Sequence, residues 1–180
     1  MRLIVLDRDG VINEDSDAFI KSPEQWVPVP GSLEAIARLN RAGWTVAVAT
    51  NQSGIARGYY DHATLSAMHQ KLQGLLRPLG GRVDWISTSP YLDHHNSPAR
   101  KPGAGMLRAI AARYGCELTG VPFVGDTWGD VQAAQAVGMQ PILVRSGKGE
   151  RTLASHAEDI AALNVPVHDN LATVAEALCP

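Results

Sequence analysis

Two carboxylates lie two positions apart near the start of the chain, in the stretch LDRDG. Asp7 and Asp9 directly follow an apolar run, and residues i and i+2 of an extended segment share one face, so both side chains can point into one site. Two close carboxylates repel each other unless a proton or a cation lies between them. The pair predicts a Mg²⁺ site, because this ion prefers oxygen ligands and often takes one or two carboxylates plus phosphate oxygens. The simpler alternative is that both acids cap a turn.

A third carboxylate follows another apolar run, VPFVG, which leads into Asp126. The carboxyl ends of parallel strands meet at one edge of a sheet, where α/β proteins bind their ligands. We therefore expect Asp126 to join Asp7 and Asp9 as a metal ligand. Asp130, four residues later, is expected to support the ion through a water molecule.

The stretch TNQSGIARG follows a third apolar run, WTVAVA. The hydroxyl of Thr50 and the main-chain N–H groups of Asn51 and Gln52 are predicted to hold phosphate oxygens. Ser53 and Arg57 are further candidates for substrate binding. The alternative is a polar turn between a strand and a loop, with no ligand.

The stretch ARKPGAG contains two cations beside a proline. Pro102 holds Lys101 extended, and a lysine close to three carboxylates would neutralise them together with a bound phosphate. Arg100 is expected to grip a second anionic group of the substrate. Solvated surface positions are the alternative for both side chains.

Apolar runs alternate with amphipathic segments along the whole chain, which predicts an α/β fold with a doubly wound, mostly parallel sheet and helices on both faces. We expect loops over 13–30 and 89–103, and no large cap domain. The expected strands cover residues 2–6, 44–50, 84–89, 121–126, 140–147 and 165–168. The expected helices cover residues 31–43 (with Ser32 as N-cap), 61–80, 104–115, 130–138, 151–163 and 170–178.

Length and composition restrict the function classes. The 180 residues, 45% of them hydrophobic, suit one globular domain over residues 1–180. A net charge of −2 gives no basic surface for nucleic acid or membrane, and no apolar run reaches the length of a membrane span. We expect a cytoplasmic monomer that binds a small molecule, with Cys116 and Cys179 as free thiols.

The four polar motifs, taken in order, resemble those of the haloacid dehalogenase-like phosphatases. Asp7-Arg8-Asp9-Gly10 matches the first motif of that family, Thr50 the second, Lys101 the third, and Gly125-Asp126 with Asp130 the fourth. The resemblance implies that Asp7 attacks phosphorus and forms an aspartyl-phosphate. It also implies that Asp9 protonates the leaving oxygen and then deprotonates the attacking water, with Mg²⁺ as cofactor.

The finer signatures LDRDGVIN, TNQSGIARG and RKPGAGM are similar to the branch of heptose bisphosphate phosphatases. The substrate implied is a sugar bisphosphate on the route to the lipopolysaccharide core. Arg8, Asp15 and Asp17 are expected among the substrate-binding residues, and the last two lie where the family places substrate contacts, in the stretch from Asp15 to Ala18. A solvated loop is the alternative for the two acids.

The chain departs from this branch in two places. Relatives often carry a zinc loop with four Cys or His ligands just before the RKP stretch, whereas this segment reads SPYLDHHNSPARKP and has no cysteine. His94 and His95 are adjacent, which does not suit a tetrahedral site, so we predict no zinc and histidines that are solvated or packed in the loop. Thr127 stands where relatives often have a lysine, which alters the charge expected near the ion.

Two other functions remain open from the sequence. One is a phosphatase for another small ester, such as histidinol phosphate. The other is a phospho-accepting receiver module, which also uses an aspartate at a strand end, a threonine, a lysine and Mg²⁺. Asp9 argues against the receiver, since an acid/base two residues from the nucleophile speeds hydrolysis of the phospho-aspartate.

Overall fold

The computed structural model describes all 180 residues and is built around a six-stranded, fully parallel sheet. The strand order is β3-β2-β1-β4-β5-β6, so the direction of winding reverses between β1 and β4. This order confirms the predicted doubly wound sheet. The strands are β1 (Arg2–Leu6), β2 (Trp44–Asn51), β3 (Trp85–Ser89), β4 (Pro122–Gly125), β5 (Gln140–Val144) and β6 (Val167–His168).

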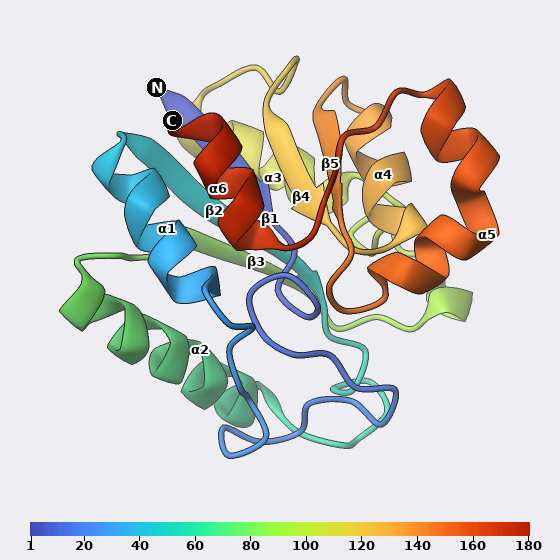
Figure 1. Cartoon of the computed structure of the whole chain (residues 1–180). Helices are drawn as coiled ribbons and strands as arrows, with labels where there is room; N and C mark the ends of the chain where they lie inside the picture. Colours follow the sequence, from blue (N-terminus) through green and yellow to red (C-terminus); the bar gives the residue numbers. More distant parts are fainter.

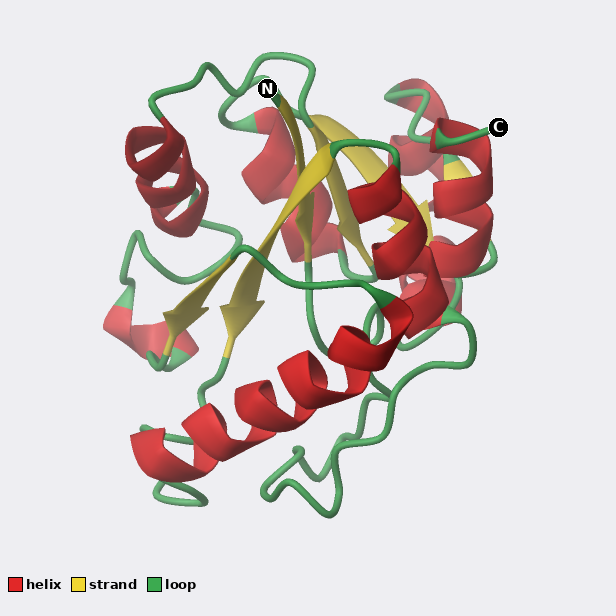
Figure 2. Ribbon diagram, turned by 90° about the vertical axis from the view of Figure 1, so that its left-hand side faces the viewer, coloured by secondary structure: helices red, strands yellow, loops and turns green.

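Helices cover both faces of the sheet (Figures 1 and 2). One face packs against α1 (Ser32–Arg41), α2 (His62–Leu76) and α6 (Leu171–Leu178). The other packs against α3 (Gly105–Tyr114), α4 (Trp128–Gln135) and α5 (Gly149–Ala162). Two short 3-10 helices complete the fold, η1 (Arg77–Leu79) and η2 (Asp93–His95).

The central strand β1 explains why its sequence is an unbroken apolar run. Ile4 and Leu6 belong to the core beneath α1, α2 and α6, whereas Leu3 and Val5 belong to the core beneath α3 and α4. A parallel strand covered on both faces needs apolar residues at every position. The first polar side chain after this run, Asp7, therefore comes at the carboxyl edge of the sheet.

The beginnings of α1, α4 and α5 differ from those predicted, and α5 begins at Gly149 instead of residue 151. Gly31, with φ of 81°, is the N-cap of α1, and Ser32 lies inside the helix, where its hydroxyl donates to the Ile12 carbonyl at 2.7 Å. Helix α4 begins at Trp128, two residues before the predicted start, because Thr127 and Asp130 form a capping box. The same box fixes Asp130 close to the end of β4.

Loops gather beyond the carboxyl ends of the strands. In Figure 1 the blue loop that connects β1 to α1 and the teal loop that follows β2 both lie at this edge. The Asp9–Asn13 and Asn13–Pro28 bridges tie the first loop together. None of the helices has the length and apolar character needed to cross a bilayer.

Candidate active site

A cleft of about 400 Å³ opens at this edge and contains most of the predicted site residues. It lies where the winding of the sheet reverses, which is the usual ligand site of such folds. Thr50 and Arg8 are the exceptions, since both are fully buried and neither lines the cleft. The predicted residues that line it are Asp7, Asp9, Asp15, Asp17, Asn51, Gln52, Ser53, Arg57, Arg100, Lys101, Asp126 and Asp130.

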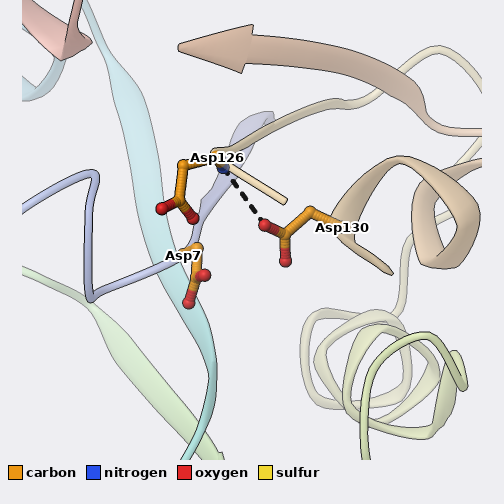
Figure 3. A group of neighbouring side chains, drawn as sticks. All are labelled: Asp7, Asp126 and Asp130. Carbon is orange, nitrogen blue, oxygen red and sulfur yellow. Dashed lines mark hydrogen bonds between the residues drawn. The ribbon is translucent and has the colours of Figure 1, made fainter. Parts of the chain in front are cut away.

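Three buried carboxylates converge on the floor of the cleft (Figure 3). Asp7 follows β1, Asp126 follows β4 and Asp130 belongs to the first turn of α4, and one oxygen of each lies within 4.8 Å of the others. Lys101 reaches into this group, with Nζ 2.9 Å from Asp7 Oδ1 and 2.7 Å from Asp130 Oδ1. The structure therefore contains the predicted arrangement, in which Lys101 lies within a buried cluster of carboxylates.

The Asp130 carboxylate is fully occupied by partners within the protein. Its Oδ2 accepts the main-chain N–H groups of Asp126 and Thr127 and the Thr127 hydroxyl, at 2.8–3.1 Å. Its Oδ1 faces Lys101. Asp130 thus positions the turn after β4 and the lysine, and the support of an ion through a water molecule that was expected of it stays a prediction.

Asp7 and Asp126, in contrast, keep oxygens that no protein group satisfies. Asp126 Oδ2 accepts the main-chain N–H of Lys148 at 2.7 Å, but its Oδ1 is buried without a partner. Asp7 Oδ1 accepts the main-chain N–H of Arg8 and faces Lys101, whereas its Oδ2 has no donor. The buried Asp126 Oδ1 without a donor is costly unless a cation binds it. Asp7 lines the cleft and has its Oδ2 free for the same ion, so this pair fits a divalent ion.

The raised pKa values of the Asp7 and Asp126 carboxyl groups also favour a bound cation at this cluster. Burial raises the pKa of Asp7 to about 7, against the lowering effect of Lys101 and with a further rise from Asp130 and Asp9. Burial, together with Asp7 and Asp130, also raises the pKa of Asp126 well above its usual value. One lysine does not balance three buried acids, and a bound divalent cation would favour the ionised forms.

The carboxylate of Asp9 lies outside this group and points toward a different set of partners. Its Oδ1 accepts from Arg8 Nη2 (2.7 Å), Arg8 Nε (3.1 Å) and Asn13 Nδ2 (2.8 Å), and its Oδ2 accepts from Gln52 Nε2 (2.9 Å). Burial alone would raise the pKa of Asp9, but Arg8 and these hydrogen bonds lower it below the usual value. The side-chain metal ligand predicted at Asp9 is therefore corrected: its carboxylate is committed to Arg8, Asn13 and Gln52.

Arg8 also differs from its predicted role as a substrate contact. Its side chain is fully buried, with Nη1 3.3 Å from His69 Nε2 and 3.8 Å from Met68 Sδ. It binds Asp9 rather than facing the cleft. A buried arginine needs a buried anion as partner, and the adjacent aspartate supplies it.

The segment after β2 positions other groups through side-chain hydrogen bonds. Asn51 clamps the main chain of Lys101, donating to its carbonyl and accepting its N–H, both at 3.0 Å. Gln52 Nε2 donates to Thr50 Oγ1 (2.9 Å), and Tyr60 donates to Gln52 Oε1 (2.5 Å). The main-chain N–H of Gln52 was predicted to hold a phosphate oxygen. It donates instead to the Ser89 carbonyl at 2.7 Å and is not free to bind phosphate.

The acids of the first loop are paired with cations of the segment after β5. Asp15 Oδ2 lies 3.1 Å from Lys148 Nζ, and Asp17 forms a two-pronged pair with Arg151 at 2.8 and 3.0 Å. Both acids line the cleft. Their expected bonds to sugar hydroxyls would have to share or replace these partners.

Several residues that line the cleft were not among the predicted site residues, and they include Phe19, Tyr60 and Lys148. Lys148 had a usable signal, because it follows the apolar run of β5 in a glycine-containing turn, SGKG. Its main-chain N–H donates to Asp126 Oδ2, and its ammonium pairs with Asp15. The aromatic residues had no comparable signal, since each lies in an irregular loop.

Gly147 makes this turn possible. Its φ is 60°, and a Cβ there would collide with the Asp126 carboxylate and the main chain of Gly10. Gly147→Ala is expected to displace Asp126 and to lower kcat at least about tenfold, in addition to a strain of about 1–2 kcal/mol. Gly43→Ala is the matched control, because Gly43 has φ of 84° and open space around it. Thermal unfolding and steady-state rates of both variants test this, and equal activity in the two would contradict it.

His94 and His95 lie exposed in η2, and His95 Nδ1 accepts the Leu92 N–H at 3.1 Å. Their rings contact each other, with centroids 4.6 Å apart. They are thus solvated and packed within the loop, as expected. The absence of zinc stays a prediction.

Comparisons with known proteins agree with this geometry. A family model described as HAD-hydrolase-like matches residues 98–174. The D-glycero-beta-D-manno-heptose-1,7-bisphosphate 7-phosphatase of Pseudomonas putida is 56% identical over 99% of both chains, and that of Pseudomonas aeruginosa is 54% identical over 98% of this chain and 97% of its own. The chain belongs to the haloacid dehalogenase-like phosphatases. The predicted enzyme class, a phosphoric monoester hydrolase, is thereby confirmed, and the receiver module is set aside.

A solved structure of this family gives the same result in three dimensions. The D,D-heptose 1,7-bisphosphate phosphatase of B. bronchiseptica, complexed with magnesium and phosphate, is 52% identical and superposes with a TM-score of 0.94. The match covers 99% of this chain and 98% of that one. The resemblance of the four motifs to this family thus extends to the whole fold.

Proposed function

We propose that this phosphatase removes the 7-phosphate of D-glycero-D-manno-heptose 1,7-bisphosphate, with Mg²⁺ as cofactor, through an aspartyl-phosphate on Asp7. The observation that carries the chemistry is the Asp7 carboxylate on the cleft floor, paired with Lys101 and retaining one oxygen without a donor. The names of the relatives support the substrate, and the magnesium and phosphate in the B. bronchiseptica enzyme support the cofactor.

The carboxylates of Asp7 and Asp126 would hold the ion, because each has an oxygen without a hydrogen-bond donor. The main-chain carbonyl of Asp9 accepts no hydrogen bond and would offer a further oxygen. Asp130 supports the site from behind. When bound, Mg²⁺ neutralises the carboxylates and offsets charge on the transferring phosphoryl group.

In the first step an oxygen of Asp7 attacks phosphorus while the bond from phosphorus to the sugar oxygen breaks. Lys101 keeps its proton, because Asp130 and Asp7 raise its pKa more than burial lowers it, and its charge stabilises the transferring group. The Ser53 main-chain N–H has no acceptor in the protein and is a donor for phosphate oxygens. Thr50 acts from behind the wall of the cleft, through Gln52.

In the second step water attacks the phosphorus of the aspartyl-phosphate, and the bond between phosphorus and the Asp7 oxygen breaks. Asp9 takes a proton from that water. Its lowered pKa keeps it ionised near neutral pH, which suits a general base. Protonation of the sugar oxygen in the first step requires Asp9 in its protonated form. The negative charge of the incoming phosphate favours this form, because it raises the pKa of Asp9.

The substrate is tested by measuring phosphate release with Mg²⁺ from heptose 1,7-bisphosphate and from histidinol phosphate in parallel. We expect kcat/KM at least about a hundredfold higher for the bisphosphate, since a second phosphate adds charged contacts that histidinol phosphate lacks. Phosphorus NMR of the product identifies which phosphate leaves. Faster turnover of histidinol phosphate, or loss of the 1-phosphate, would overturn the proposed substrate.

The proposed reaction places the enzyme in the synthesis of ADP-heptose for the lipopolysaccharide core. Such a step acts on a small soluble sugar phosphate, and a cytoplasmic monomer suits it. The pathway, the cytoplasmic location and the monomeric state are inferred from the proposed substrate, so a different substrate would remove the support for them.

A further inference from the structure

Four cationic side chains line the cleft, and only one of them has no partner. Lys101 and Lys148 are paired with carboxylates of the cleft. Arg100, which was expected to grip a second anionic group, donates to the Tyr91 carbonyl at 3.3 Å and has its Nε 4.0 Å from Asp93, although this Nε makes no hydrogen bond. The Arg57 guanidinium forms neither an ion pair nor a hydrogen bond, although its main-chain N–H donates to Ser53. It is therefore the cation of the cleft most available to an anionic ligand.

Arg57 is nevertheless held in place by an aromatic ring. Its guanidinium carbon lies 5.3 Å from the centroid of the Phe19 ring, within the range of a cation–π contact. The other neighbour of Phe19 is Tyr59, with centroids 5.2 Å apart and ring planes at 66°. Phe19 belongs to the loop after β1, and Arg57 and Tyr59 belong to the loop after β2, so these contacts join two loops that lie side by side in Figure 1. Phe19 and Arg57 both line the cleft.

The backbone at Phe19 is strained. Its φ is 68°, and the only other residues outside glycine with positive φ are Asn96 and Asn164. Asparagine tolerates this conformation, whereas a bulky aromatic residue does so rarely. The turn is imposed locally, since the Phe19 N–H donates to the Ser16 carbonyl at 3.0 Å. Strain of this kind persists only where the surrounding structure holds it, and such residues cluster at active sites and ligand-binding sites.

We propose that Phe19 is a positioning residue for substrate specificity: its ring holds Arg57 at the cleft, where the guanidinium binds the second phosphate of a sugar bisphosphate. The proposal rests on the proposed function, and it names the residue pair that distinguishes a bisphosphate from a monophosphate. The reacting phosphate lies at Asp7 and Lys101, so a second anion needs a separate cation. Arg57 meets this need without breaking an existing ion pair.

The test compares kcat/KM for heptose 1,7-bisphosphate and heptose 7-phosphate. Arg57→Gln is expected to lower the value for the bisphosphate about 10- to 100-fold, mainly through KM, and to change the monophosphate less than about threefold. Phe19→Gly removes the ring and suits the positive φ, so it should fold normally by circular dichroism. It is expected to cost about 3- to 10-fold on the bisphosphate only. Phe19→Tyr keeps the ring face and should restore the preference.

Arg108→Gln is the matched control, because Arg108 is exposed on α3 and lies outside the cleft. A wild-type enzyme with no preference for the bisphosphate would overturn the proposed function itself. A wild-type preference that survives in Arg57→Gln would overturn this inference alone. A preference lost in Arg57→Gln but kept in Phe19→Gly would overturn the positioning role of Phe19.

Discussion

Asp7→Asn is expected to lower kcat at least about a thousandfold while leaving the protein folded. An amide is a poor nucleophile toward phosphorus, and it cannot form the acyl phosphate that divides the displacement into two steps. The fold should tolerate the change, because it removes one of three buried carboxylates that raise one another's pKa. Thermal unfolding without Mg²⁺ should give a Tm equal to or above that of the wild type.

The measurement combines steady-state phosphate release with a chemical trap for the phosphoenzyme. The wild type should incorporate acid-stable, hydroxylamine-labile phosphate during turnover, and Asp7→Asn should incorporate none. Asp159→Asn is the control, since Asp159 is exposed and its partner is His156 on the same helix. Residual activity above about one per cent would argue against covalent catalysis.

The sheet was predictable because its physical signals are local. An apolar run such as RLIVL has no polar position, so it specifies a strand covered on both faces. The chain reverses its winding beside β1, which brings Asp7 and Asp126 together across neighbouring strands, as their positions at the ends of apolar runs implied. The convergence of Asp7, Asp126 and Lys101 at one edge of the sheet therefore followed from the sequence, whereas the position of the Asp9 carboxylate did not.

The orientation of side chains within the site was not predictable in the same way. Asp9 lies two residues from Asp7, and spacing alone placed both on one face. A bulge-like turn at Gly10, with φ of 82°, and the buried arginine before Asp9 turn its carboxylate toward Arg8, Asn13 and Gln52 instead. These contacts join the first loop to β2, and a linear pattern does not contain them.

Asp7 and Asp9 have different surroundings, which suit them to the different roles proposed for them. Asp7 is surrounded by acids and one lysine, and burial raises its pKa, so its reactivity depends on the cation beside it. Asp9 has four donors and a lowered pKa, so its charge is maintained by the protein itself. In the proposed mechanism, a nucleophile and a base would thus be obtained from one residue type by different surroundings.

Asp9→Asn is the second substitution with a large expected effect, a loss of about 10²- to 10⁴-fold in kcat on the sugar substrate. The amide neither protonates the leaving oxygen nor accepts a proton from water. The NH₂ group of the new asparagine would also face Gln52 Nε2, which is itself a donor. Rotating the Gln52 amide to present its oxygen would break the hydrogen bond that Tyr60 donates to Gln52 Oε1. The aspartyl-phosphate should therefore accumulate.

The two roles of Asp9 separate when the leaving group changes. p-Nitrophenolate leaves without a proton, so Asp9→Asn should form the phosphoenzyme from p-nitrophenyl phosphate at a rate close to that of the wild type, and then hydrolyse it slowly. Stopped-flow absorbance should show a burst of about one p-nitrophenolate per enzyme followed by a slow phase. A single slow phase without a burst would mean that Asp9 is needed to form the phosphoenzyme even when no proton is required, which would refute the acid/base assignment.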